Sequence, residues 1–193
     1  MNIELESMGI EMPRVAGHPN RQAFRGVLTL VDVVSDKSPA GARGHRVVLA
    51  RSAAEAALAS LLGMGLDYAP ALDRHDTRRK IGVITRAEIV GRQLELGGYL
   101  FAKDFPEIVR EIGRGSGMRR GLNAREGSGR PALLASGEGH HVHNPLGMSY
   151  EIADARVADA RSRVWTLTRV TFTGAAVLRR DKAAYRDTWI ELE

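Results

Sequence analysis

The chain has 193 residues, no cysteine, 28 basic and 23 acidic side chains, and a hydrophobic fraction of 44%. The absence of cysteine excludes a disulfide-stapled module, a thiol enzyme and a cysteine-bound zinc site. The hydrophobic fraction excludes a disordered protein, no stretch approaches the roughly 20 apolar residues that cross a bilayer, and the length fits one domain, so we expect a soluble intracellular protein.

Residues 1–23 predict an N-terminal leader ahead of a single domain at residues 24–193. The leader mixes Glu, Met, Pro and Gly without a sustained hydrophobic period. Glu4, Glu6 and Glu11 lie where a signal peptide would have a basic start followed by an apolar run. We therefore expect no secretory signal.

Two strands and a helix are predicted at the start of the domain. Residues 24–34 are rich in β-forming side chains, and residues 46–50 predict a second strand after a turn of Ser, Pro and Gly. Ser52 and Glu55 form a capping-box pattern, in which the serine caps one free amide and the glutamate reaches back to another. The alanine-rich run that follows predicts a helix as far as Leu62, because two glycines come directly after it.

The middle of the chain predicts a loop, a strand, a hairpin and a second helix. Residues 66–80 contain a proline and a charged stretch, which indicate a loop, and residues 81–85 predict a strand. Residues 87–101 predict a hairpin that turns at Gly91. Residues 104–112 predict a helix that begins with an aspartate cap.

The last part of the chain is dominated by strands. Residues 113–145 form a long Gly- and Arg-rich segment, and a loop of this length inside a compact domain is usually functional or disordered. Strands are predicted at residues 146–152, 164–173 and 189–192, with a short helix at residues 181–187. The excess of strand over helix predicts an α+β, mainly β fold, a small mixed β-barrel flanked by two or three helices.

The positive charge comes mainly from arginine, which supplies 24 of the 28 basic residues. Six arginines and two glutamates lie between Arg110 and Arg130, among glycines and serines rather than aromatic residues. A flexible basic segment of this kind can contact phosphate. It equally fits a solvated loop or a contact surface for acidic protein partners, and both interpretations are kept.

Two residues, His75 and Ser149, can carry chemistry together. His75 lies between Asp73 and Asp76 just before a predicted strand, and Ser149 lies in a small-residue turn that enters another strand. An acyl-transfer hydrolase needs a hydroxyl nucleophile and an imidazole within hydrogen-bond reach. A loop histidine paired with Asp76 and an ordinary strand serine would give the same pattern, so the residues alone leave both interpretations open.

The predicted elements around His75 and Ser149 occur in a characteristic order along the chain. A strand precedes the loop that bears the histidine, a hairpin and a helix follow, and a small-residue element then leads to a late strand. The defining residues are His75-Asp76, Ile81-Gly82-Val83-Ile84, Gly147-Met148-Ser149-Tyr150 and Val170-Thr171-Phe172. From about residue 24 to residue 185, this ordered set resembles the prohead maturation proteases of tailed bacteriophages, which are distant relatives of the herpesvirus assemblin protease.

The resemblance implies a herpesvirus-protease-like fold and a serine endopeptidase in which Ser149 is the nucleophile and His75 the general base. It implies cleavage of scaffold protein and major capsid protein during head maturation, inside the assembling prohead in the host cytoplasm. It implies no metal and no organic cofactor. Self-association is left open, and we expect neither membrane nor nucleic-acid partners.

The chain departs from the family at the third member of the site. The phage family often places a carboxylate at the position that matches Thr166, yet no acidic residue lies between Ala160 and Arg180. The herpesvirus type uses a second histidine in that region, whereas here all six histidines lie at or before His143. The orienting group must come from elsewhere, or the site works as a Ser–His dyad.

Glu151 is our candidate for the orienting group. It follows Ser149 by two residues on a predicted strand, so both side chains point to the same face. A solvent-facing role for Glu151 is the alternative. Asp76 is a second candidate, although an adjacent residue rarely orients the ring of its neighbour.

Two further groups of residues are candidates for parts of the site. The herpesvirus type stabilises the oxyanion with an arginine-rich turn some way after the serine, and Arg179 and Arg180 lie in a comparable place; two surface arginines are the alternative. A histidine cluster precedes Ser149 and has the residue types of a zinc or nickel site, but it lacks an obvious third ligand beyond one glutamate. We interpret it as a surface loop, and its residues are His140, His141, His143 and Glu138.

The sequence is therefore compatible with three functions. The first is the serine endopeptidase. The second is a catalytically weak or inactive protease-like protein that serves structure or assembly in the phage head, which Thr166 favours by standing where an acid is expected. The third, a nucleic-acid-binding module, is supported only by arginine content, because no helix-turn-helix, zinc finger or aromatic platform is recognisable.

Overall fold

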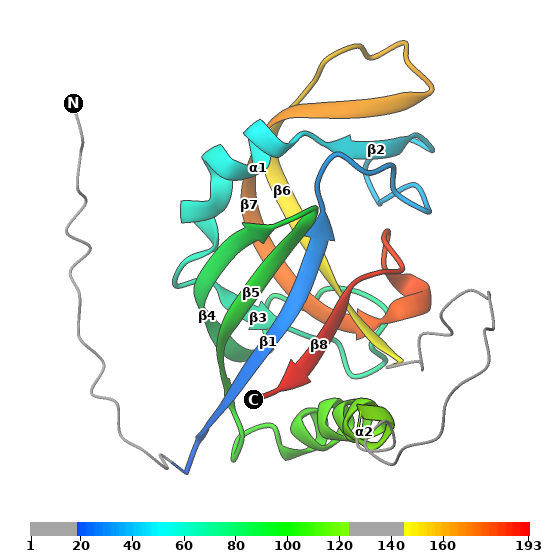
Figure 1. Cartoon of the computed structure of the whole chain (residues 1–193). Coiled ribbons are helices and arrows are strands. Elements are labelled where there is room, and N and C mark those ends of the chain that lie inside the picture. Colours follow the sequence, from blue (N-terminus) through cyan, green and yellow to red (C-terminus); the bar gives the residue numbers. More distant parts are fainter. Residues whose placement is uncertain (1–18, 124–144) are drawn as a thin grey trace, which may run out of the picture.

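The computed structural model of the protein describes residues 19–123 and 145–193 (Figure 1). Most of the expected leader, and much of the expected Gly- and Arg-rich loop with its histidine cluster, lie outside these residues. Within them, no helix is long and apolar enough to cross a membrane. The described residues are mixed α+β and mostly sheet, as the sequence predicts.

Strands make up most of the described chain, joined by two α-helices and two short 3-10 helices. The helical elements are α1 (Arg51–Ala57), η1 (Leu58–Leu61), α2 (Pro106–Asn123) and η2 (Arg180–Lys182). The strands are β1 (Arg21–Leu30), β2 (Arg46–Leu49), β3 (Gly65–Asp67), β4 (Lys80–Val90), β5 (Gln93–Phe101), β6 (Leu146–Val157), β7 (Val164–Arg179) and β8 (Trp189–Leu192).

The strands form one eight-stranded sheet, in which seven strands follow the order β2-β7-β3-β4-β5-β1-β8 and the eighth, β6, pairs with β7. β3 and β6 both pair with Ala175 and Ala176, so β6 lies on the edge of β7 opposite β3. Among the described residues these pairings do not close on themselves, so the expected small mixed β-barrel is not confirmed. Where β6 passes the start of β8, the Met148 N–H donates to the Thr188 hydroxyl at 3.2 Å instead of joining a ladder.

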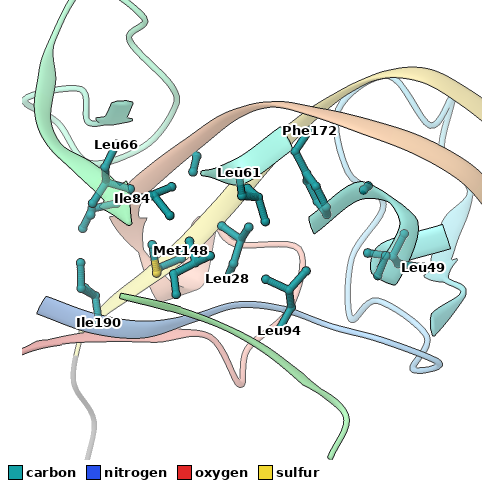
Figure 2. Packing of buried hydrophobic residues seen from close by; sticks show 14 of the residues in the cluster. Leu28, Leu49, Leu61, Leu66, Ile84, Leu94, Met148, Phe172 and Ile190 are labelled. Carbon is teal, nitrogen blue, oxygen red and sulfur yellow. The ribbon is translucent and has the colours of Figure 1, made fainter. Parts of the chain in front are cut away.

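The sheet bends around a single large core. Figure 1 shows β4, β5, β1 and β8 crossing in front of β6 and β7, with α1 at one end of the molecule and α2 at the other. All eight strands point at least one buried side chain inward, and Figure 2 shows one from each: Leu28, Leu49, Leu66, Ile84, Leu94, Met148, Phe172 and Ile190. Each such side chain contributes about 1.5–3 kcal/mol by leaving water.

The predicted hairpin is confirmed. β4 and β5 pair antiparallel from Val90 and Gln93 outward, around a turn at Gly91 whose φ of +59° suits a glycine. β6, β7 and β8 confirm the three late strands, and β6 and β7 run longer than predicted. β1 begins at Arg21, three residues inside the expected leader.

The first helix is confirmed, but its capping box is wrong. The residue before α1 is Ala50, Ser52 lies inside the helix, and no side-chain cap forms there. Instead, Oδ1 of Asp32, a residue from the segment after β1, accepts the Arg51 N–H at 3.0 Å. A carboxylate distant in sequence therefore satisfies the exposed amide, which a local pattern cannot reveal.

Two other boundaries also differ from expectation. α2 runs to Asn123, so the first third of the expected Gly- and Arg-rich loop is helical. The helix is anchored by Ile108 and Ile112, which are buried in the core, and this packing outweighs the low helix propensity of the glycines that follow. The predicted helix at residues 181–187 is reduced to the single 3-10 turn η2.

Gly26 on β1 lies where β1, β6 and β8 pack so closely that a side chain would not fit. A Cβ at this position would lie 2.4 Å from the Trp189 carbonyl oxygen and 2.9 Å from the Met148 Sδ. We expect Gly26→Ala to lower the free energy of unfolding by about 1–3 kcal/mol, because the overpacked site must push β8 or β6 away. Urea denaturation followed by circular dichroism measures this.

Gly113 provides the matched control. A Cβ there would make only an ordinary contact, 3.4 Å from Leu192 Cδ1, within α2. Gly113→Ala should leave stability unchanged or raise it by about 1 kcal/mol through helix propensity. Equal losses in the two variants would show that crowding at Gly26 is not the cause.

Candidate active site

The side chains of Asp67 and Ser149 lie in one row across three neighbouring strands. On β7, Ala176 is the register partner of Asp67 in β3 and also of Ser149 in β6. Directly opposed residues point to the same face of a sheet. The adjacent residues Leu66 and Met148 are buried in the core, so the row lies on the outer face of the sheet.

Ala176 leaves room for a ring between the other two side chains. Strands are spaced about 4.8 Å apart, which places the backbones of Asp67 and Ser149 about 10 Å apart across the methyl group of Ala176. Tyr150, next to Ser149, belongs to the other face, and burial raises its pKa to about 12. Tyr150 therefore stays protonated at neutral pH and offers no base to the site.

The loop between β3 and β4 covers this row and carries His75. The Leu72 carbonyl accepts the Arg179 N–H at 2.7 Å, which ties the loop to the end of β7. At its base, the Tyr68 N–H donates to the Arg79 carbonyl at 3.3 Å. The His75 side chain is only 14% exposed.

His75 lies between two carboxylates. Its Nδ1 is 3.5 Å from Oδ1 of Asp67 and 3.9 Å from Oε1 of Glu151. Both ring nitrogens are buried, and neither makes a hydrogen bond within the described residues. The Ser149 hydroxyl is therefore not hydrogen-bonded to the ring here, and a proton relay requires the two groups to approach.

Asp67 is a fully buried carboxylate that has several donors around it. Its side chain has no exposed surface, Oδ1 accepts the Asp76 N–H at 3.1 Å, and Oδ2 lies 3.3 Å from Lys80 Nζ. Burial alone would raise the pKa of Asp67, but the contact with His75, the Asp76 amide and the Lys80 charge together hold it below its ordinary value of 3.8. The group is ionised at neutral pH.

Glu151 reaches His75 because Gly174 gives it room. Glu151 pairs in register with Gly174 on β7, and a Cβ on that glycine would lie 2.8 Å from Glu151 Oε2. The structure thus brings Glu151 to the ring, as the shared strand face with Ser149 predicted. Its side chain is 45% exposed, which separates it from the buried Asp67.

Asp76 does not face the histidine ring as an orienting group. Its carboxylate contacts Arg78 Nε at 3.6 Å and Arg79 Nε at 3.7 Å, and its backbone amide serves Asp67. Thr166, the position matched to the family acid, pairs with Val48 near the other end of β7, ten residues from Ala176.

The two candidate oxyanion residues lie at the end of β7: Arg179 is the last residue of the strand, and Arg180 begins η2. Arg179 is the register partner of Leu146, and its Nε lies 3.4 Å from Asp181. The backbone amides of Arg179 and Arg180 donate to the carbonyls of Leu72 and Pro145 at 2.7 and 2.8 Å. Both backbone amides are therefore engaged and do not form an oxyanion hole in this arrangement.

Asp67 is the site residue that sequence reasoning missed. Residues 66–80 were expected to form a loop, but Gly65–Asp67 form β3, and the correction brings an acid into the row. The available signal was weak: Asp67 is the one acidic residue in an otherwise apolar stretch before the charged part of the loop. Only the pairing of β3 with β7 shows that this acid is buried beside His75.

Comparison with models of known protein families and with curated proteins finds no match to the chain. The resemblance to prohead proteases therefore stays a prediction. What the described residues do provide is a buried acid, a histidine and a strand serine on one face of a sheet, without a cluster of ligands that could hold a metal ion.

The charge on Asp67 makes a testable contribution to stability. Its pKa is lowered on folding, so its stabilisation is complete above the unfolded value near 3.8 and is lost as the pH falls through the lower folded value. We expect Asp67→Asn to lower the free energy of unfolding by about 1–3 kcal/mol at pH 7. We also expect the variant to lose less stability than the wild type between about pH 5 and pH 2.

Urea denaturation over a series of pH values measures both effects. Asp73→Asn, which changes an exposed carboxylate of the same loop, is the control and should keep the acid dependence of the wild type. An Asp67→Asn variant that loses as much stability in acid as the wild type would contradict an ionised, paired Asp67.

Proposed function

We propose that the protein is a serine endopeptidase that cleaves scaffold and major capsid protein segments during maturation of a phage head. Ser149 is the nucleophile and His75 the general base. The observation that supports this best is the position of His75. Its ring is held by the β3–β4 loop on the face that Ser149 shares, with its Nδ1 toward carboxylates.

The reaction would proceed in two halves. The Ser149 Oγ attacks the scissile carbonyl carbon while Nε2 of His75 takes the hydroxyl proton, and the carbonyl oxygen takes the displaced electron pair. The C–N bond then breaks, and His75 returns the proton to the leaving amine. A water molecule, deprotonated by the same nitrogen, then attacks the acyl carbon; the ester bond to Ser149 Oγ breaks, and His75 returns the proton to that oxygen.

We also propose that the chain has a herpesvirus-protease-like fold. An α+β sheet bent around one core, with the histidine on a loop outside it and the serine on a strand, is compatible with a herpesvirus-protease-like domain. The location inside an assembling prohead, in the host cytoplasm, belongs to the same proposal.

A second function has one observation in its favour. Because no hydrogen bond joins Ser149 to His75, the chain could equally be a catalytically weak or inactive protease-like protein that serves assembly of the head. Catalytic hydrogen bonds are often long in enzymes without substrate and shorten in the substrate complex. The two functions differ in whether the Ser149 hydroxyl reacts.

Reactivity can be measured without knowing the substrate. We expect a fluorophosphonate to attach covalently to Ser149 in the wild type, located by mass spectrometry of the digested protein, because an imidazole at the hydroxyl is what such reagents require. Ser149→Ala and His75→Ala should both lose the label. Ser38→Ala, which changes an exposed serine far from the loop of His75 in sequence, should keep it.

Cleavage is measured by co-expression with the scaffold and major capsid proteins of the same phage. Processing should fall on the order of 10⁴-fold or more in Ser149→Ala and in His75→Ala. Intact partners in every sample, together with no labelling, would favour the assembly protein. Equal processing by the wild type and Ser149→Ala would overturn the residue assignment.

A further inference from the structure

We propose that Asp67 is the positioning residue of the site, the third member that orients the His75 imidazole toward Ser149. This inference rests on the proposed function. It places the acid ahead of the histidine in the chain, on β3, rather than after the serine where Thr166 stands.

The first reason is that Asp67 is held in one place. A carboxylate with no exposed surface is stable only when it is fully paired. Oδ1 receives the Asp76 N–H and faces Nδ1 of His75, while Oδ2 faces Lys80. Because donors surround both oxygens and β3 fixes the backbone, the carboxylate has a fixed position from which it can orient the imidazole.

The second reason is that the alternative acids fit less well. Glu151 is 3.9 Å from the same nitrogen, has a longer side chain and is 45% exposed, so solvent competes for it. The Asp76 carboxylate is directed to Arg78 and Arg79. Asp67 is both nearer to the ring, at 3.5 Å, and buried.

The third reason concerns Nε2, the His75 ring nitrogen that does not face Asp67. A carboxylate at Nδ1 holds the proton on that nitrogen in the neutral ring, so the lone pair is on Nε2. Nε2 is buried and makes no hydrogen bond within the described residues. This is the atom that must accept the Ser149 proton, and no hydrogen bond from the described residues engages it.

The pairing of β3, β7 and β6 explains why the acid can come from this place. Asp67 and Ser149 flank Ala176 in one row, so a ring lying over the small alanine can face an acid on one side and a hydroxyl on the other. A side chain larger than alanine at this position would fill the space of the ring. The three members of the site occur along the chain in the order Asp67, His75 and Ser149.

The first test compares two acids in the cleavage reaction. We expect Asp67→Asn to lower kcat by about 10²–10⁴-fold with little change in KM, because the ring is misoriented but the substrate still binds. Glu151→Gln should lower kcat less than tenfold. Asp73→Asn, which changes an exposed carboxylate of the same loop, should keep the wild-type kcat, which separates orientation of the ring from a loss of charge in the loop.

The second test measures the tautomer of His75 by NMR spectroscopy and does not require enzymatic activity. In protein labelled with ¹⁵N-histidine, the His75 signals are assigned by their absence from His75→Gln, and their shifts at alkaline pH report which nitrogen carries the proton. We expect the Nδ1–H form in the wild type and in Glu151→Gln. In Asp67→Asn a measurable share should move to the Nε2–H form.

The two tests fail in distinguishable ways. If the wild type does not cleave or react with the fluorophosphonate, the proposed function fails, but the ¹⁵N signals still test whether Asp67 fixes the ring. If the wild type cleaves through Ser149 and His75, yet Asp67→Asn keeps its kcat and its Nδ1–H form, the role of Asp67 is overturned and the function stands. A larger effect of Glu151→Gln on both readouts would transfer the role to Glu151.

Discussion

The pairing of β7 along both of its edges is the constraint on which the rest of the structure depends. One edge pairs with β2 and β3, and the other pairs with β6. Ala175 and Val177 of β7 enter the core while Ala176 between them lies on the outer face, and Phe172 enters the core beyond the register shift opposite Glu151 and Ile152. The strand therefore organises the core on one side and brings β3 and β6 to a shared row on the other.

Burial of the Asp67 charge is the second constraint, and it links folding to the site. A buried carboxylate requires donors, and those available come from the loop and strand that follow it: the Asp76 amide, Lys80 and His75. The same contacts that keep the acid ionised also keep the loop against the sheet. Stability of the loop and orientation of the imidazole thus have a common cause, as would be expected if the site depends on preorganisation.

The two ring nitrogens of His75 have different surroundings. Nδ1 has two carboxylates near it, whereas Nε2 has no hydrogen-bond partner among the described residues. A rotation of the Ser149 side chain, or a small movement of the loop on substrate binding, would be needed for proton transfer. Because backbone pairing fixes Ser149 and Asp67, such movement belongs to side chains and to the loop rather than to the sheet.

Elements that depend on local patterns could be predicted from the amino-acid sequence. The hairpin around Gly91 and the late strands followed from alternation and turn chemistry, and the shared face of Ser149 and Glu151 followed from strand periodicity. Tertiary structure alone decided the cap of α1 by Asp32, the extension of α2, and the place of Asp67. These depend on contacts between residues far apart in the chain, and a three-residue strand such as β3 is too short for periodicity to reveal. The burial that makes Asp67 useful arises only when β3 pairs with β7 and the loop of His75 closes over both.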